Sequence, residues 1–244
     1  TSKPIHYIIF IIVLTFVFTY QRIIASNQVI NPANSLRELG YLLVLLAFFV
    51  TLIFIVTKNN LTHNNSYAAL YFCLFIGLIP ASLELNSILV SNLFILLSLR
   101  RIISLKTKIN IKKKLFDAAM WICLAATFEP WAILFLVLLF MGLLFYSLAQ
   151  IKNIIIPFLG ILTVGTLLAC FRLLTEGVLP NATEYLPTFS FDALSSNYVV
   201  TQGTSLLFLA VILLAVLTFT IKGVLKNRRK NPSFLVLILA IFLG

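Results

Sequence analysis

Long runs of apolar residues, separated by short polar stretches, dominate this chain. The runs cover residues 5–24, 41–57, 66–80, 86–99, 116–128, 131–149, 154–174, 203–221 and 233 onward. They lack the alternation of apolar and polar positions that marks the strands of a membrane β-barrel. Helices are the other structure that satisfies every backbone hydrogen bond inside lipid. The pattern therefore predicts an all-α, polytopic transmembrane helical bundle of eight or nine spans, including short helical hairpins.

Composition excludes the soluble alternatives. Apolar residues make up 61% of the chain and charged residues 10%, and the mean hydropathy is +1.09. Soluble proteins are about half apolar and about a quarter charged, so too few polar side chains are present to cover a water-soluble globule. The net charge is +11, but the bases stand in blocks between apolar runs, which is typical of membrane topology rather than of nucleic-acid binding.

We expect a single integral membrane domain over residues 1–244, with the lipid bilayer as its surroundings and no nucleic-acid partner. The chain lacks an initiator Met and stops inside an apolar run that begins at Ser233. Twelve helical residues rise only about 18 Å, short of a hydrocarbon core of about 30 Å. The natural protein is therefore expected to continue at both ends.

Two basic blocks predict the orientation. Residues 100–114 and 222–230 contain most of the Lys and Arg, and the positive-inside rule places both blocks in the cytoplasm. An even number of spans must then separate them, which requires residues 116–149 to form two helices. A break at Glu129-Pro130 supplies this, because proline lacks a backbone donor and disfavours helix at the residue before it.

The resulting topology is that of a multi-pass membrane protein with a cytoplasmic N-terminus. The outer loops fall at residues 25–40, 80–86, 129–130 and 175–202.

Cysteine and histidine indicate no metal chemistry. Cys73, Cys123 and Cys170 each lie inside an apolar run without a CxxC pattern, so we interpret them as packing residues. His6 and His63 have no Cys, Asp or Glu at ligand spacing. The sequence therefore predicts neither a metal site nor a cofactor.

Acidic residues fall mostly in the outer loops of this topology, and only Asp117 falls inside, beside the basic block. Ionisable groups at membrane depth are costly and commonly functional, whereas groups near helix ends reach water at little cost. Two interpretations stay open: solvated helix ends with local ion pairs, or a functional site on the outer face. The candidate site residues are Arg37, Glu38, Glu84, Glu129 and Arg172.

Three further features carry alternatives of their own. Arg172 and Glu176 are four residues apart, so they are expected to share one helix face. The basic residues 100–114 have two interpretations. They set the topology and contact anionic lipid headgroups, or they bind a cytosolic or lipid-phosphate partner. The small residues Gly160, Gly165 and Ala169 fit packing inside the bundle, or docking of a neighbouring subunit.

Two stretches carry a resemblance to known proteins. The first runs from Ala81-Ser82-Leu83-Glu84-Leu85-Asn86 to Arg100-Arg101, and the second from Lys114-Leu115-Phe116-Asp117 to Phe128-Glu129-Pro130-Trp131. They resemble an uncharacterised family of polytopic inner-membrane proteins of Bacteroidota. That resemblance implies the membrane fold and attaches no biochemical role to it.

A more distant resemblance is to the C-type membrane glycosyltransferases that use polyprenyl-linked sugars. It rests on short hairpins joined by an Arg-rich cytoplasmic loop. In that family an acid in the first outer loop acts as base or orients the acceptor, and basic residues hold the lipid phosphate. The resemblance implies Glu38 as base, Arg37 and Arg172 at the phosphate, and Glu84 and Glu129 at sugar hydroxyls. The Asp usual in that loop is absent here.

Two functions follow as alternatives. In the first, the chain is a non-catalytic integral subunit of a larger inner-membrane complex of the cell envelope, for transport or assembly, with partner membrane proteins. In the second, it is a glycosyltransferase- or polymerase-like enzyme using a polyprenyl-phosphate-linked sugar at the periplasmic face. The absent Asp and the lack of any strong motif favour the first.

Overall fold

The computed structural model describes residues 4–25, 32–59, 66–78, 83, 86–178 and 218. Within these ranges the chain forms helices and no strand. The α-helices are α1 (Pro4–Thr19), α2 (Pro32–Lys58), α3 (Tyr67–Leu78), α4 (Asn86–Ser104), α5 (Ile111–Phe128), α6 (Phe135–Phe145) and α7 (Ile151–Glu176). A π-helix, η1 (Tyr20–Ala25), extends α1, and two 3₁₀ segments are η3 (Leu105–Thr107) and η4 (Pro130–Leu134). The predicted all-α class is confirmed.

Four helical segments are long and apolar enough to cross a membrane. They are Ile5–Arg22, Ser35–Lys58, Asn86–Thr107 and Ile151–Glu176. Two shorter apolar helices, Tyr67–Leu78 and Pro130–Phe145, accompany them. A helix of about 20 residues spans a hydrocarbon core of about 30 Å. The molecule is therefore built as a membrane protein, while the eight or nine spans and the cytoplasmic N-terminus stay predictions.

The predicted break at Glu129-Pro130 is confirmed. α5 ends at Phe128, Glu129 is extended (φ −140°, ψ 108°), and Pro130 begins η4, which leads into α6. Proline cannot donate the backbone hydrogen bond that would continue α5. The chain therefore turns back, and η4 and α6 both pack against α5.

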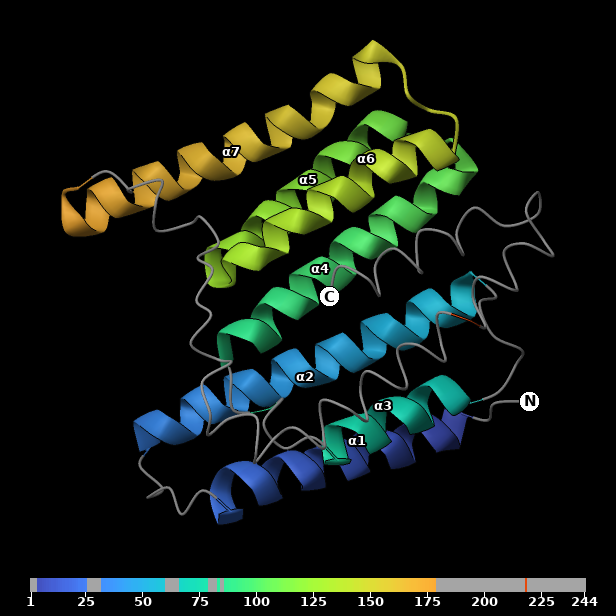
Figure 1. Ribbon diagram of the computed structural model, residues 1–244. Helices are drawn as coiled ribbons and strands as arrows, with labels where there is room; N and C mark the ends of the chain where they lie inside the picture. The colour runs from blue at the N-terminus through green and yellow to red at the C-terminus, as the bar shows by residue number, and fades with distance from the viewer. Residues whose placement is uncertain are drawn as a thin grey trace.

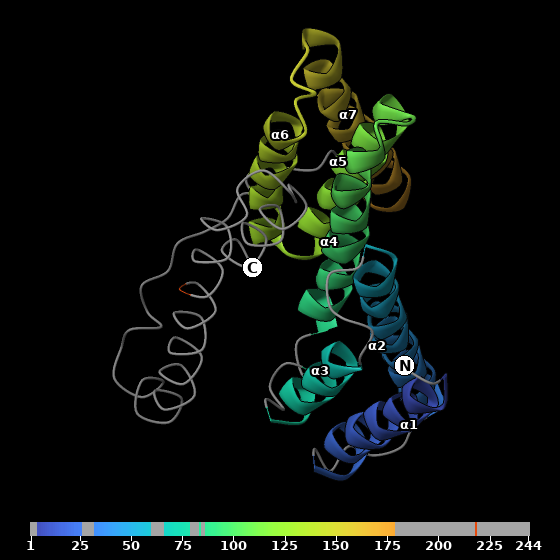
Figure 2. The ribbon, with the colours of Figure 1, turned by 90° about the vertical axis from the view of Figure 1, so that its right-hand side faces the viewer.

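The largest apolar core lies between α4, α5 and α6. Its fully buried side chains include Ile103 on α4, Leu115 and Ile122 on α5, and Leu139 on α6. On the other side of α5, α7 approaches closely at Gly160. Smaller apolar clusters hold α1, α2 and α3 together. The helices thus follow one another across the molecule, from α1 through α2, α4 and α5 to α7 (Figures 1 and 2).

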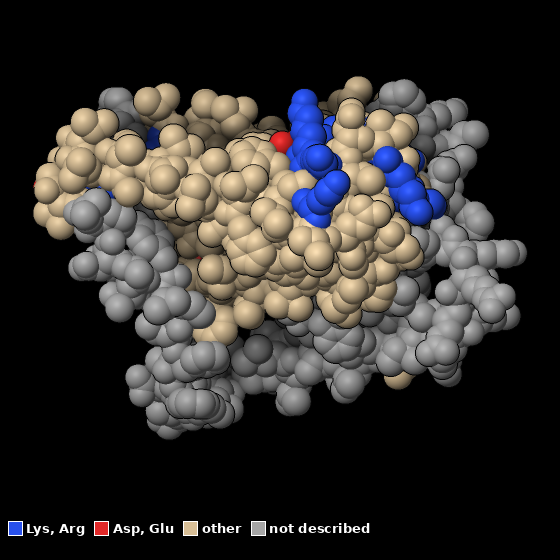
Figure 3. All heavy atoms as spheres, turned by 90° about the horizontal axis from the view of Figure 1, so that it is seen from above, with Lys and Arg blue, Asp and Glu red and all other residues tan. Residues whose placement is uncertain are grey.

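Successive helices run in alternating directions, so the chain reversals gather at two ends of the bundle (Figure 1). One end holds Glu38, Glu129 and Glu176, and we call it the glutamate end. The opposite end carries most bases of the described ranges and is called the basic end; Figure 3 shows part of this gathering on an otherwise largely uncharged face. By the bounds of the helices, its members are Lys58, Arg100, Arg101, Lys106, Lys108, Lys112, Lys113, Lys114 and Lys152.

Candidate functional site

Arg22 reaches the interior of the bundle from a locally distorted helix. The hydroxyls of Thr15 and Thr19 donate to the backbone oxygens of Ile11 (2.8 Å) and Thr15 (2.9 Å). Threonine bonds of this kind compete with the helix ladder and bend helices. Directly after Thr19 the helix widens into η1, which carries Arg22. Single π turns are rare and occur often at functional sites, so this segment is the starting point for a candidate site.

The Arg22 side chain binds groups from two other helices at the glutamate end. Its Nε lies 2.8 Å from Oε2 of Glu38 on α2, and its Nη2 donates to Oδ1 of Asn86, the first residue of α4. The guanidinium carbon lies 5.4 Å from the ring centre of Tyr41 and 5.8 Å from that of Phe18. Arg22 is only 8% exposed. We call these five residues the Arg22 cluster.

Helical spacing explains how the cluster assembles. Phe18 and Arg22 are four residues apart, and Glu38 and Tyr41 are three apart, so each pair shares one helix face. The two faces meet where α1 and η1 lie beside α2, and the start of α4 closes the third side. The cluster therefore ties three separate parts of the chain together with one guanidinium group.

The chemistry of arginine suits this position. Its planar, permanently charged group forms ion pairs and stacks on aromatic faces, and cations are attracted to ring faces within about 6 Å. The contact between Arg22 and Glu38 is ionic rather than a directed hydrogen bond. In the preceding residue, Gln21, the side-chain oxygen is buried and has no hydrogen-bond partner in the part of the chain described.

The structure brings together two of the five predicted site residues. The second oxygen of Glu38 lies 3.9 Å from Nε of Arg37, and the Glu38 side chain is 13% exposed, against 56% for Arg37. Glu38 therefore faces one buried and one exposed guanidinium group. Sequence reasoning missed Arg22 and Asn86. One feature of the sequence could have indicated Arg22: it is the one Lys or Arg in the apolar run 5–24.

Arg172 and Glu129 lie elsewhere at the glutamate end. Arg172 pairs with Glu176 across one helical turn, Nε to Oε2 at 3.8 Å, as the spacing predicted. Glu129 directly follows the last residue of α5, and its backbone N–H donates to the oxygen of Ala125 (3.0 Å). α4 and α5 stand between α2 and α7 (Figures 1 and 2), so Arg172 is kept apart from the Arg22 cluster. Glu84 lies outside the described residues.

The basic end has its own network. Arg101 on α4 pairs with Asp117 on α5, Nη2 to Oδ2 at 2.9 Å, which confirms the prediction that Asp117 stands beside the basic block. Nζ of Lys114 donates to the backbone oxygen of Ser104 (2.6 Å) and to the hydroxyl of Thr107 (2.7 Å). Partial burial, and then the nearby charge of Arg101, lower the pKa of Lys114. Positive charge is therefore crowded here.

Metal binding has no support in the described ranges. No three His, Cys, Asp or Glu side chains gather there. Cys73 and Cys123 are buried and Cys170 is exposed, and all three are free thiols. His63 lies outside the described residues.

Comparison with protein-family models, curated proteins and solved structures finds no match to this chain. The resemblances drawn from the sequence therefore stay predictions.

Proposed function

We propose that the chain is a non-catalytic integral subunit of a larger complex of the cell envelope in the bacterial inner membrane. The observation that carries the proposal is the environment of Glu38. This carboxylate, the base that an enzyme would need, is paired with a buried arginine at 2.8 Å. Removing either partner of such a pair leaves an uncompensated charge in the interior. We therefore infer that Glu38 holds helices together and does not take a proton from a substrate.

A subunit needs a surface for its partners, and α7 has two distinct faces. On one, Gly160 and Val164 are buried against α5; a Cβ at Gly160 would lie 2.9 Å from Cβ of Ala119. On the other, Gly165 has no atom within 4 Å of an added Cβ, and Leu162 is 64% exposed. Small residues let helices approach closely in lipid. We propose that the Gly165 face meets a transmembrane helix of a partner subunit.

The test compares the two glycines of α7. Gly165→Leu should leave the thermal stability of the purified chain in detergent unchanged but remove the protein that co-purifies with the wild type. Gly160→Leu is the matched control, because it should lower the stability itself. If the Gly165→Leu chain keeps its stoichiometric partner, the proposed docking face is wrong.

A second candidate is the enzyme acting on a polyprenyl-phosphate-linked sugar. One observation favours it: the side-chain oxygen of Gln21, next to Arg22 in sequence, is buried without a hydrogen-bond partner in the described part of the chain, as a polar group held for a ligand would be. In that case Glu38 would serve as base and Arg37 would hold the phosphate. The separation of Arg172 from this cluster by α4 and α5 speaks against one shared site. The Glu38→Gln variant described below separates the two functions.

A further inference from the structure

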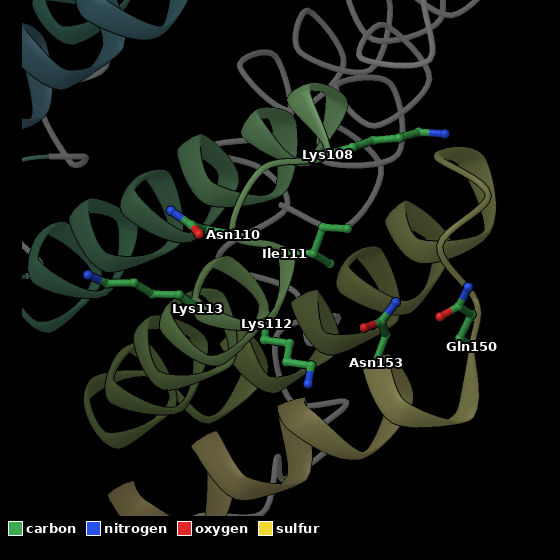
Figure 4. A pocket seen from close by; sticks show the side chains of 7 residues that line it. All are labelled: Lys108, Asn110, Ile111, Lys112, Lys113, Gln150 and Asn153. Atoms are coloured by element: carbon green, nitrogen blue, oxygen red, sulfur yellow. The ribbon is translucent and has the colours of Figure 1, made fainter.

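A pocket of about 530 Å³, open to the surroundings and called the cavity below, lies at the basic end between the start of α5 and the start of α7 (Figure 4). Pockets for small ligands commonly measure about 300–1,000 Å³. None of its described lining residues is acidic. The polar ones are Lys108, Asn110, Lys112, Lys113, Gln150 and Asn153.

The two helix starts at this cavity carry unbalanced positive charge. α5 begins after Asn110 and α7 after Gln150; neither side chain caps its helix, and neither helix has an acid in its first turn. The first N–H groups of a helix lack partners inside it and form the positive end of the helix dipole. Lys112 and Lys113 nevertheless occupy the first turn of α5. A bound anion would relieve this repulsion.

Asn153 adds a second, independent feature. It is 7% exposed, and its Nδ2 donates to the backbone oxygen of Leu148 (2.8 Å). Among the described residues its Oδ1 has no hydrogen-bond partner. Figure 4 shows this side chain at the cavity, beside Lys112, whereas Lys108 and Lys113 extend outward. The cavity therefore offers an acceptor oxygen, on a largely buried side chain, next to a cationic donor.

We propose that this cavity binds a phosphate ester that also carries a hydroxyl or ammonium donor, as a phospholipid headgroup does. Lys112 and the helix starts would contact the phosphate, and Oδ1 of Asn153 would accept from the hydroxyl or ammonium group. The cavity borders Ile151, where a candidate membrane span begins, so it lies at the depth of a headgroup. The site is independent of the proposed function.

Native mass spectrometry of the detergent-solubilised chain with added phosphatidylglycerol tests the site. Lys112→Gln should weaken phosphatidylglycerol binding about tenfold, the effect of one charge-assisted hydrogen bond, and adding Lys113→Gln should weaken it further. The matched control is Lys106→Gln, which removes the same charge from the same basic block outside the cavity lining. It should change the affinity by less than about twofold, within the small effect of an exposed charge. Lys112 and Lys106 are both exposed, so the thermal midpoint should stay constant.

Two further ligands define the chemistry and its source. Phosphatidylcholine has a phosphate but no donor for Asn153, so it should bind more weakly than phosphatidylglycerol. If glycerol 3-phosphate binds as tightly as the lipid and with the same dependence on Lys112, the ligand is a soluble phosphate ester; if it does not, the ligand is a lipid. Equal weakening by Lys106→Gln and Lys112→Gln, or no binding of either phosphate ester, would overturn the site.

Discussion

At the scale of single residues, Arg22 illustrates how a charge is accommodated inside an apolar bundle. It is 8% exposed, and its guanidinium group contacts the Glu38 carboxylate, the Asn86 amide and two aromatic rings. The carboxylate lies at Nε, the amide oxygen at Nη2, and the two rings face the guanidinium carbon. Burying a pair of charges is costly, but losing one partner costs more, because the other is left without compensation. The cluster therefore acts as a unit.

Glu38→Gln should lower the thermal stability of the purified chain, by an amount equivalent to about 3–5 kcal/mol for a broken buried pair. Arg22→Gln should do the same, and the double variant should be more stable than the sum of the two losses predicts. The measurement is thermal unfolding in detergent, monitored as the loss of soluble protein with rising temperature. The control is Arg37→Gln, since Arg37 is exposed and lies 3.9 Å from Glu38, and it should change little.

The enzyme alternative predicts a different result for the same residue. A catalytic base supplies roughly 10²–10⁴-fold in rate, so Glu38→Gln would abolish the activity while leaving abundance and stability unchanged. A stable, abundant but inactive Glu38→Gln chain would contradict the structural role assigned to the pair.

At the scale of elements, close packing of α7 on α5 depends on Gly160. A Cβ there would lie 2.9 Å from Cβ of Ala119 and 3.0 Å from the backbone oxygen of Phe116, which is closer than packed atoms tolerate. Gly160→Ala should therefore lower stability by about 1–3 kcal/mol through overpacking. Gly165→Ala is the matched control on the same helix, because nothing lies near that position. Equal thermal midpoints for the two variants would contradict the packing described.

Helix positions could be predicted from the sequence where apolarity alone decides them. α7 covers the predicted run 154–174, and α5 ends at Phe128 as the proline required. α2 begins at Pro32 instead of residue 41, because its first turns, with Arg37 and Glu38, are helical but polar. A pattern of apolar residues cannot detect such turns. The ion pair between Arg22 and Glu38 could not be predicted either. It depends on how η1 packs against α2, and no pattern of neighbouring residues in the sequence shows that packing.

At the scale of the whole molecule, charge is distributed between two ends. The alternating helices place Glu38, Glu129 and Glu176 at one end and most described bases at the other (Figure 1). The positive-inside rule predicts that the basic end lies in the cytoplasm. The glutamate end would then face the periplasm, together with the Arg22 cluster.

Cysteine accessibility measures this orientation. In a Cys170→Ser background, which removes the exposed thiol, Glu129→Cys should react with an impermeant thiol reagent in intact spheroplasts, and Ser104→Cys should not. Both positions should react after the membrane is permeabilised. If only Ser104→Cys is labelled in intact spheroplasts, the predicted orientation is wrong and the opposite one holds.

The mass and composition of the wild-type particle after mild detergent extraction test the central claim most directly. A non-catalytic subunit should leave the membrane with a second membrane protein in fixed stoichiometry. The partner should persist in Arg37→Gln and be lost in Gly165→Leu. A chain that is extracted alone, with a polyprenyl phosphate bound, would contradict the account and favour the enzyme.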